Sequence, residues 1–183
     1  LQRANNELKL IEIISEVSKN LKIQIETFKI STPETYYSAV ISHAYYCIFY
    51  SAKAYLLSKG IKTDVPQEHQ RTYLEFKKLA EEGIITLELL KIYDEILIKS
   101  EDLICIFKLE KSKRGKFTYK QLPQANVEPA KESIDNATIF FKTIYGLLTE
   151  MDKKTNKLKI NLDLRVGKIL EVKEHPNADK LFV

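Results

Sequence analysis

The sequence predicts an all-α protein, an up-down antiparallel bundle of about five helices that ends in a short C-terminal β segment. Three observations support this fold class. The chain of 183 residues holds only 5 glycines and 5 prolines, so few residues interrupt a helix. Apolar residues recur at steps of three and four along most of the chain. The connections between these periodic segments are short, which places successive helices antiparallel.

The composition bounds the class of protein. A hydrophobic content of 44% suffices for a core and excludes a largely disordered chain. The net charge of +4 is compatible with a nucleic-acid partner. Cys47 and Cys105 are expected to be packed, reduced thiols, and no metal-ligand spacing occurs, so neither a metal nor another cofactor is expected. Without a membrane-length apolar run or a signal peptide, a cytoplasmic protein with no membrane partner is expected, and the start at Leu1 suggests a missing upstream segment.

The first two helices follow from apolar spacing and end signals. The first is expected to bury one stripe of residues at helical spacing: Leu10, Ile14, Val17, Leu21, Ile25 and Phe28. The second is expected from Pro33 to Lys59. Ser31 and Thr32 offer a hydroxyl cap before the proline, and Gly60 supplies the stop.

Three more helices and one change of pattern follow. Helices are expected over residues 66–82, with Gly83 as the stop, and over residues 86–109. Residues 111–126 lack periodicity. A last helix over 128–151 is expected to bury Ile134, Ala137, Phe141, Ile144 and Leu148. After a polar run, residues 158–166 alternate apolar and polar side chains, which predicts a strand. We expect a bundle over 1–154, a linker over 155–160 and a second domain beginning at 161.

The second helix is rich in aromatic residues interleaved with alanines, as in a packed core helix. An alternative is a ring-lined groove that holds a nucleotide or nucleic acid, because buried tyrosine hydroxyls need partners. The cleft candidates are Tyr37, His43 and Tyr46 from this helix, with His69 and Arg71 from the next.

Residues 37–60 resemble the central helix of the HEPN family, which reads A-x-x-x-x-Y-x-x-F-x-A-A-K-A-L-L-x-x-G. Lys62-Thr63, His69 and Phe76 are similar to the K-T-H stretch of that family, although Asp64 follows the threonine here. Residues 114–119 and 128–141 are similar to its last loop and closing helix. The resemblance covers most of residues 5–150. It implies a helical bundle that forms a homodimer and, in many members, a ribonuclease of a toxin–antitoxin pair.

The ribonuclease members carry an Arg, a polar residue, and a His after four to six positions, in which Arg stabilises phosphate charge and His transfers protons. No arginine and histidine of this chain stand at that spacing, so we predict no catalytic residue and expect a non-enzyme. A composite site of His43, His69 and Arg71 is the alternative.

Cations gather before the last helix, with two aromatic rings among them. Cations neutralise phosphates and rings stack on bases, so this segment is a candidate RNA contact. A solvated loop with its rings packed on the bundle is the equal alternative. The candidates are Lys111, Lys113, Arg114, Lys116, Phe117, Tyr119 and Lys120.

Residues 163–183, DLRVGKILEVKEHPNADKLFV, resemble the start of the tRNA-binding domain attached to methionyl- and phenylalanyl-tRNA synthetases. The residues themselves indicate two strands joined at a His-Pro-Asn-Ala-Asp turn. The resemblance implies an OB-fold, of which this chain holds the first two strands, and tRNA as the ligand. Arg165 and Lys168 are the candidate contacts.

The function hypothesis is a non-catalytic RNA-binding protein, with tRNA as the expected RNA. Two alternatives stay open. One is a toxin-type ribonuclease with a degenerate site, and the other is a dimerising interaction module that pairs with a nucleotidyltransferase-like protein.

Overall fold

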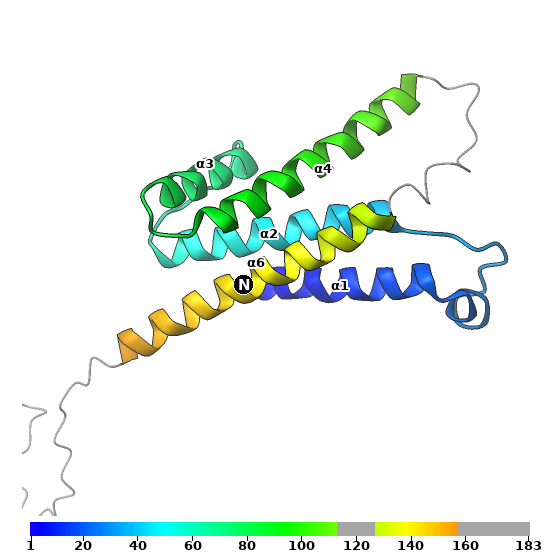
Figure 1. Ribbon diagram of the computed structural model, residues 1–183, viewed down its shortest axis with the longest axis horizontal. Coiled ribbons are helices and arrows are strands. Elements are labelled where there is room, and N and C mark those ends of the chain that lie inside the picture. The colour runs from blue at the N-terminus through cyan, green and yellow to red at the C-terminus, as the bar shows by residue number, and fades with distance from the viewer. Residues whose placement is uncertain (113–126, 157–183) are drawn as a thin grey trace, which may run out of the picture. The chain divides into compact units, whose positions relative to one another are not determined.

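The computed structural model describes residues 1–112 and 127–156 of the chain, and within these residues every regular element is helical. The all-α prediction is therefore confirmed for this part. Several predictions fall outside the described residues. These are the two expected strands, the candidate contacts from Lys113 to Lys120, and the candidate contacts Arg165 and Lys168. The chain divides into two compact units, Leu1–Met151 and Asp152–Val183. The elements are α1 (Gln2–Lys19), the π-helical turn η1 (Ile23–Thr27), α2 (Tyr37–Ser58), α3 (Glu68–Glu81), α4 (Leu87–Ser112) and α6 (Val127–Asn156), shown in Figure 1.

Helices α1 and α2 lie side by side and run antiparallel (Figure 1). Near the start of α1, the Arg3 guanidinium lies 5.4 Å from the ring centroid of Tyr50. One turn later, Glu7 contacts His43, which lies nearer the start of α2. Because the order of contacts reverses between the two helices, the chain turns back on itself as predicted.

The same reversal joins α4 to α6. The amide Nδ2 of Asn136 donates to Glu95 Oε2 at 3.1 Å, and Lys99 Nζ donates to Glu132 Oε2 at 2.7 Å. Rising positions on α4 thus meet falling positions on α6. These two polar contacts fix the register of α4 against α6. Other residues of both helices are buried in the core.

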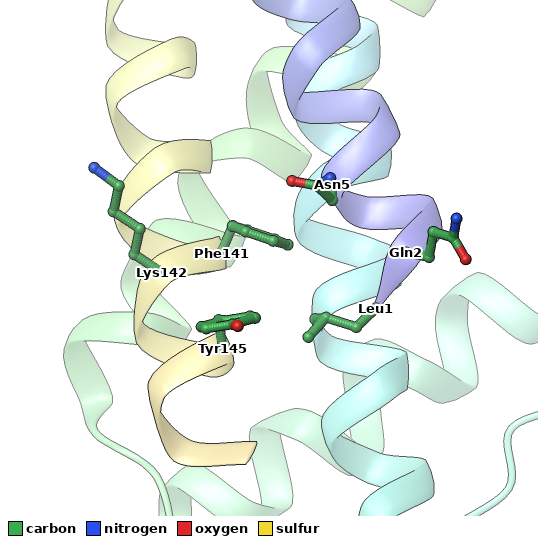
Figure 2. Close-up of a pocket in the computed structure, with 6 residues that line it drawn as sticks. All are labelled: Leu1, Gln2, Asn5, Phe141, Lys142 and Tyr145. Carbon is green, nitrogen blue, oxygen red and sulfur yellow. The ribbon is translucent and has the colours of Figure 1, made fainter. Parts of the chain in front are cut away.

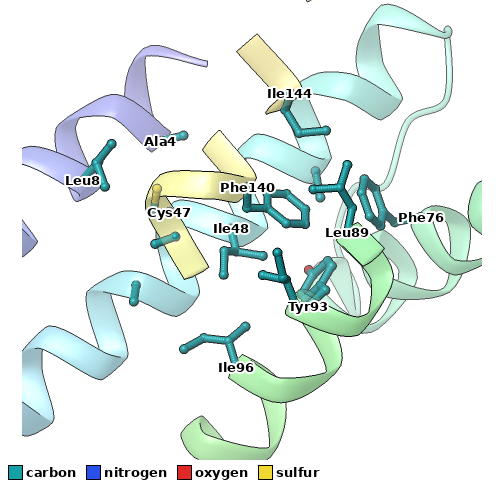
Figure 3. Packing of buried hydrophobic residues seen from close by; sticks show 14 of the residues in the cluster. Ala4, Leu8, Cys47, Ile48, Phe76, Leu89, Tyr93, Ile96, Phe140 and Ile144 are labelled. Atoms are coloured by element: carbon teal, nitrogen blue, oxygen red, sulfur yellow. The ribbon is translucent and has the colours of Figure 1, made fainter. Parts of the chain in front are cut away.

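The core is centred on three aromatic rings from three helices: Phe76, Tyr93 and Phe140 (Figure 3). Their centroids are 5.4–6.0 Å apart, and Tyr93 meets both phenylalanines edge to face. All three are fully buried. Edge-to-face rings pack well and add roughly 0.5–1.5 kcal/mol per pair beyond area burial.

The predicted apolar stripe of the first helix is wrong. The buried face of α1 carries Leu8 and Ile11 with small residues such as Ser15, whereas Leu10 is 36% exposed and Phe28 is 56% exposed. Small side chains let α1 approach α2 closely, so the contact face is chosen by residue size as well as by hydrophobicity. The other stripe members, Ile14, Val17, Leu21 and Ile25, are half-buried or exposed.

The first helix also ends earlier than predicted, at Lys19, because the backbone of Asn20 is extended (φ −109°, ψ 92°). The expected cap of the second helix is wrong as well. Residues 33–36 precede α2, whose N-cap is Tyr36 without a side-chain hydrogen bond. Instead, Gln24 holds this segment: its Nε2 donates to the Glu34 carbonyl at 2.8 Å, and its Oε1 accepts from the Glu34 amide at 2.9 Å.

The predicted helix stops agree with the structure. Gly60 and Gly83 follow α2 and α3 with φ of +78° and +71°, a region that favours glycine. Helix α6 continues to Asn156, past the predicted end at Met151. No glycine or proline interrupts that stretch, so the polar run that starts at Asp152 begins as helix. The chain division at 154 stays a prediction.

In α6 the buried face is centred on Ala137, Phe140 and Ile144. Two of these three were predicted to be buried. The other predicted members, Ile134, Phe141 and Leu148, are half-buried at the edge of the core. The predicted face is therefore rotated slightly from the observed one.

Candidate functional site

Aromatic residues of α2 and one histidine of α3 form a cluster, which we call the α2 aromatic cluster: Tyr45, Tyr46, Phe49, Tyr50 and His69. The residues at 45, 46, 49 and 50 fall at helical spacing, so their rings lie on neighbouring faces of one helix. Together they present rings from the buried side of α2 to its surface. Phe49 is 1% exposed, whereas Tyr46 is 38% exposed.

His69 is the centre of this cluster. Its ring stacks on Phe49 with centroids 4.0 Å apart and an interplanar angle of 17°. Its Nδ1 lies 2.8 Å from the hydroxyl of Tyr45. Burial raises the pKa of that tyrosine to about 12, with smaller contributions from Tyr46 and Glu101, so the hydroxyl stays protonated at neutral pH. Tyr45 is thus a neutral hydrogen-bond partner that fixes the ring of His69.

His43 is held by α1. Its Nδ1 lies 2.7 Å from Glu7 Oε2, and the two side chains are 32% and 23% exposed. A carboxylate on Nδ1 orients an imidazole and leaves Nε2 for another partner, which is how many enzymes position a base. Such a contact also joins two helices, and a half-buried histidine between helices is more commonly structural.

Most charges beside the aromatic cluster are paired. Lys53 of α2 contacts Glu68, and its Nζ lies 3.9 Å from Asp64 Oδ1. The hydrogen bond from Lys53 holds the pKa of Glu68 below its usual value, and Lys53, His69 and Arg3 add favourable charge. The local surface is therefore close to neutral. Phosphate binding needs uncompensated cations, and near this cluster the guanidinium groups of Arg3 and Arg71 form no ion pair with a carboxylate of the described residues.

The five predicted cleft residues are dispersed. Tyr46 and His69 do meet, with ring centroids 6.1 Å apart. Tyr37 is 8% exposed and belongs to the core, and Arg71 donates from Nη1 to the carbonyl of Asp64 at 3.4 Å. No described contact joins Arg71 to His43 or His69. The composite catalytic site stays a prediction without a geometric arrangement behind it.

A second feature, which the sequence did not reveal, is a hollow of about 520 Å³ between the first turns of α1 and the middle of α6 (Figure 2). Phe141 and Tyr145 line one side, one helical turn apart, and their rings point toward Leu1 and Asn5 on the other. The only hint in the sequence is the spacing of Phe141 and Tyr145, which places two aromatic rings on one face of a helix. Finding the opposite wall requires the tertiary structure. The hollow is lined by Leu1, Gln2, Asn5, Phe141, Lys142 and Tyr145.

Metal and membrane sites can be checked on the same residues. Among residues 1–112 and 127–156, no group of three His, Cys, Asp or Glu side chains is arranged to hold a metal ion. None of the helices described there is long and apolar enough to cross a membrane.

Comparison with known proteins adds two findings. A model of the HEPN domain family matches residues 22–150. The chain is also similar to several methionine–tRNA ligases. The enzyme of Pyrococcus abyssi is 45% identical over 65 residues, which cover 31% of this chain and 9% of the relative. That of Thermococcus onnurineus is 44% identical over 62 residues, covering 27% and 8%.

A longer match is to the methionine–tRNA ligase of Pyrococcus horikoshii, at 30% identity over 133 residues, covering 66% of this chain and 16% of the relative. The chain therefore spans less than a fifth of the length of each of these relatives. No solved structure matches the chain.

Proposed function

The chain belongs to the HEPN domain family, and from this premise we propose that it binds RNA without cleaving it. The observation that carries the proposal is that no described contact joins either histidine of the bundle to a cation. His43 is engaged by Glu7, and His69 is stacked on Phe49 and bonded to Tyr45. Metal-free RNA cleavage most often uses a histidine that reaches the substrate, beside a cation that stabilises the phosphate. Neither histidine has such a neighbour in a described contact.

We propose tRNA as the RNA. The support is the tail, residues 163–183, together with the similarity to three proteins whose names include tRNA. The tail carries Arg165 and Lys168, and the segment before α6 carries the basic cluster of Lys113, Arg114 and Lys116. Since the charges around the α2 aromatic cluster are largely paired, these other segments are the better candidates for phosphate contacts. Ligase activity is no part of the proposal.

In this assignment the two basic segments hold the RNA and the bundle supplies the rigid scaffold. The remaining candidates of the basic segment, Lys111 and Lys120, add charge, and its two rings stack on unpaired bases. Lys111 belongs to the last turn of α4, and the other residues of the segment lie between α4 and α6 in the chain. The rings are Phe117 and Tyr119.

Filter binding of unmodified tRNA at low salt tests the assignment. The triple variant K113E/R114E/K116E should lower affinity at least ten-fold, and R165E/K168E should lower it similarly. The matched control is K9E/K19E/K22E, which changes the net charge by the same amount at three exposed positions of the α1 region. Equal loss in the control and in the first triple variant would reduce the effect to net charge and remove the basic segment from the site.

A cleavage assay separates binding from nuclease activity. Fluorescently labelled tRNA incubated with the protein and a chelator should stay intact. Turnover that is lost in His43→Ala or His69→Ala would contradict the proposal and favour the ribonuclease alternative. If the protein neither binds nor cleaves tRNA, the result would favour the alternative of a dimerising interaction module.

We also propose that the bundle forms a homodimer, as many members of this family do. Light scattering coupled to size-exclusion chromatography measures the mass directly: a dimer is expected near twice the 21.2 kDa of the chain. A concentration-independent monomer would count against it. A nucleotidyltransferase-like partner is the alternative in that case.

A further inference from the structure

Helix α1 carries two stripes of side chains, each at alternating steps of three and four. The buried stripe packs on α2 and consists of Ala4, Leu8, Ile11, Ser15 and Ser18. The other stripe, which we call the α1 seam, consists of Asn6, Leu10, Ile13 and Val17. Leu10 and Ile13 are exposed, and Figure 1 shows α1 at the edge of the bundle. This spacing is that of the contact line between paired helices, so α1 has a second face suited to a helix.

The α1 seam is part of a longer exposed apolar surface. Leu21, Ile25 and Phe28, which follow α1 in the chain, are exposed as well. Single exposed apolar residues are common on monomers, whereas a row of them marks a surface that meets another macromolecule. Because the seam lies on a different side of α1 from the buried stripe, packing within the described bundle leaves it open to a partner.

The charges beside the α1 seam indicate which helix it meets. Lys9 and Glu16 stand on the same edge of the seam, and both are exposed. Neither forms an ion pair with a described residue, although Asn20 Nδ2 donates to Glu16 Oε1 at 3.5 Å. In an antiparallel pair related by a two-fold axis, the same edge of both helices comes together. A second copy of α1 therefore offers an opposite charge to each of these two residues.

One register satisfies both the apolar and the charged residues. With the two-fold axis near the middle of α1, Leu10 faces the partner's Ile13. In the same register, Lys9 faces the partner's Glu16. A shift by one heptad in either direction sets Lys9 against the partner's Lys9, or Glu16 against the partner's Glu16, which like-charge repulsion disfavours. A parallel pair sets Lys9 against the partner's Ile14 and pairs no charges. The pattern therefore favours one antiparallel register.

We propose that two copies of the chain meet along the α1 seam as an antiparallel pair of α1 helices, with Leu10 and Ile13 at the centre. Ion pairs between Lys9 and the partner's Glu16 flank this centre. The 18 residues of α1 span about 27 Å, enough for several layers of side chains. Exposed ion pairs add little affinity, so they select the register while apolar burial holds the pair. The inference rests on the proposed homodimer and adds the face through which it forms.

Sedimentation equilibrium of the full chain measures the dissociation constant of the dimer and tests the register. Lys9→Glu and Glu16→Lys should each weaken the dimer at least five-fold, because a two-fold dimer contains each ion pair twice. The double variant K9E/E16K should return within two-fold of the wild-type value. Lys19→Glu and Glu12→Lys are the matched controls, since they make the same charge changes at exposed positions on another face of α1. Each control should stay within two-fold.

A substitution in the seam tests the apolar contact. Ile13→Arg should give a monomer with unchanged circular dichroism, because Ile13 is 59% exposed within one chain. Ile139→Arg, at an exposed position of α6, should stay dimeric. A dimer that Ile13→Arg leaves intact overturns the α1 seam while the homodimer stands, and a wild-type monomer at every concentration overturns both. A double variant K9E/E16K no tighter than its single variants overturns the proposed register.

The tRNA assay keeps this proposal separate from RNA binding. The charge control K9E/K19E/K22E carries Lys9→Glu and should also weaken the dimer, so its mass is measured before its tRNA affinity is compared. If K113E/R114E/K116E and R165E/K168E leave tRNA retention unchanged while K9E/E16K restores the dimer, the assignment of the basic segments fails and the α1 seam stands.

Discussion

Glu7 Oε2 lies 2.7 Å from His43 Nδ1, joining the first turns of α1 to the start of α2. Both side chains are less than one-third exposed, so water competes only partly for this hydrogen bond. A hydrogen bond to a charged group contributes roughly 1.5–3 kcal/mol when buried and less with partial exposure. The contact therefore has a structural role whether or not the imidazole meets a ligand.

The first prediction concerns this pair. Glu7→Ala should lower the free energy of unfolding by about 1 kcal/mol, since His43 loses its acceptor in a half-buried position. Glu7→Gln should lower it less, because the amide oxygen still accepts a hydrogen bond. Urea denaturation followed by circular dichroism measures both. Glu12→Ala, an exposed position on the same helix, is the control, and an equal loss there would show that the contact has no specific effect.

The second prediction concerns Gln24, which is 2% exposed. Its amide bonds three backbone groups: the carbonyl of Val17 and both polar groups of Glu34. Gln24→Leu has nearly the same size but leaves these groups without partners. Each unsatisfied buried group costs roughly 1–3 kcal/mol, so a loss of about 3 kcal/mol is expected in urea denaturation. Gln70→Leu, at an exposed glutamine of α3, should change stability by less than about 0.5 kcal/mol.

The helix stop at Gly60 could be predicted from the sequence, whereas the role of Gln24 could not. A glycine after a periodic segment has a local meaning, because positive φ favours glycine wherever a helix ends. The stops at Gly60 and Gly83 were therefore predicted correctly. The role of Gln24 depends on Glu34, ten residues away in an irregular segment, and no local pattern contains that contact. The same reason explains why the first helix was predicted too long.

In the candidate sites, too, contacts between neighbouring helices could be predicted, whereas contacts between residues distant in the sequence could not. The meeting of Tyr46 with His69 follows from two aromatic groups on consecutive helices, and the sequence placed both in one cleft. The hollow was missed because Asn5 and Tyr145 belong to helices that are far apart in the sequence. Arg71 was placed with the histidines by proximity in sequence. In the structure it bonds the backbone of the preceding turn instead.

The third prediction is a pH dependence of stability. The pKa of Glu68 is lowered in the folded protein, mainly by the hydrogen bond from Lys53. A depressed carboxyl pKa gives stability above the unfolded value, which is 4.5, and this stability is lost as pH falls through the folded value. Lys53→Met should therefore lower the free energy of unfolding at pH 7 by more than at pH 3. Urea denaturation at both values measures this difference.

Lys91→Met serves as the control for that experiment, because Lys91 is exposed and has no ion pair among the described residues. Its effect should not change with pH. A Lys53→Met effect of equal size at pH 3 and pH 7 would show that Lys53 stabilises the fold by packing of its aliphatic chain alone.

The last prediction concerns Cys47, which is fully buried between α1 and α2. Burial, together with the nearby charge of Glu7, raises the pKa of its thiol to about 12, although a hydrogen bond with Ser51 opposes this shift. Only the thiolate reacts with disulfide reagents, so a neutral and buried thiol is inert. In a Cys105→Ser background, Cys47 should react with a chromogenic disulfide at pH 8 at least about a hundred-fold more slowly in the folded protein than in 6 M guanidinium. Glu7→Gln should raise the folded rate slightly, since it removes the nearby negative charge, and equal rates in the folded and unfolded protein would contradict the burial of this thiol.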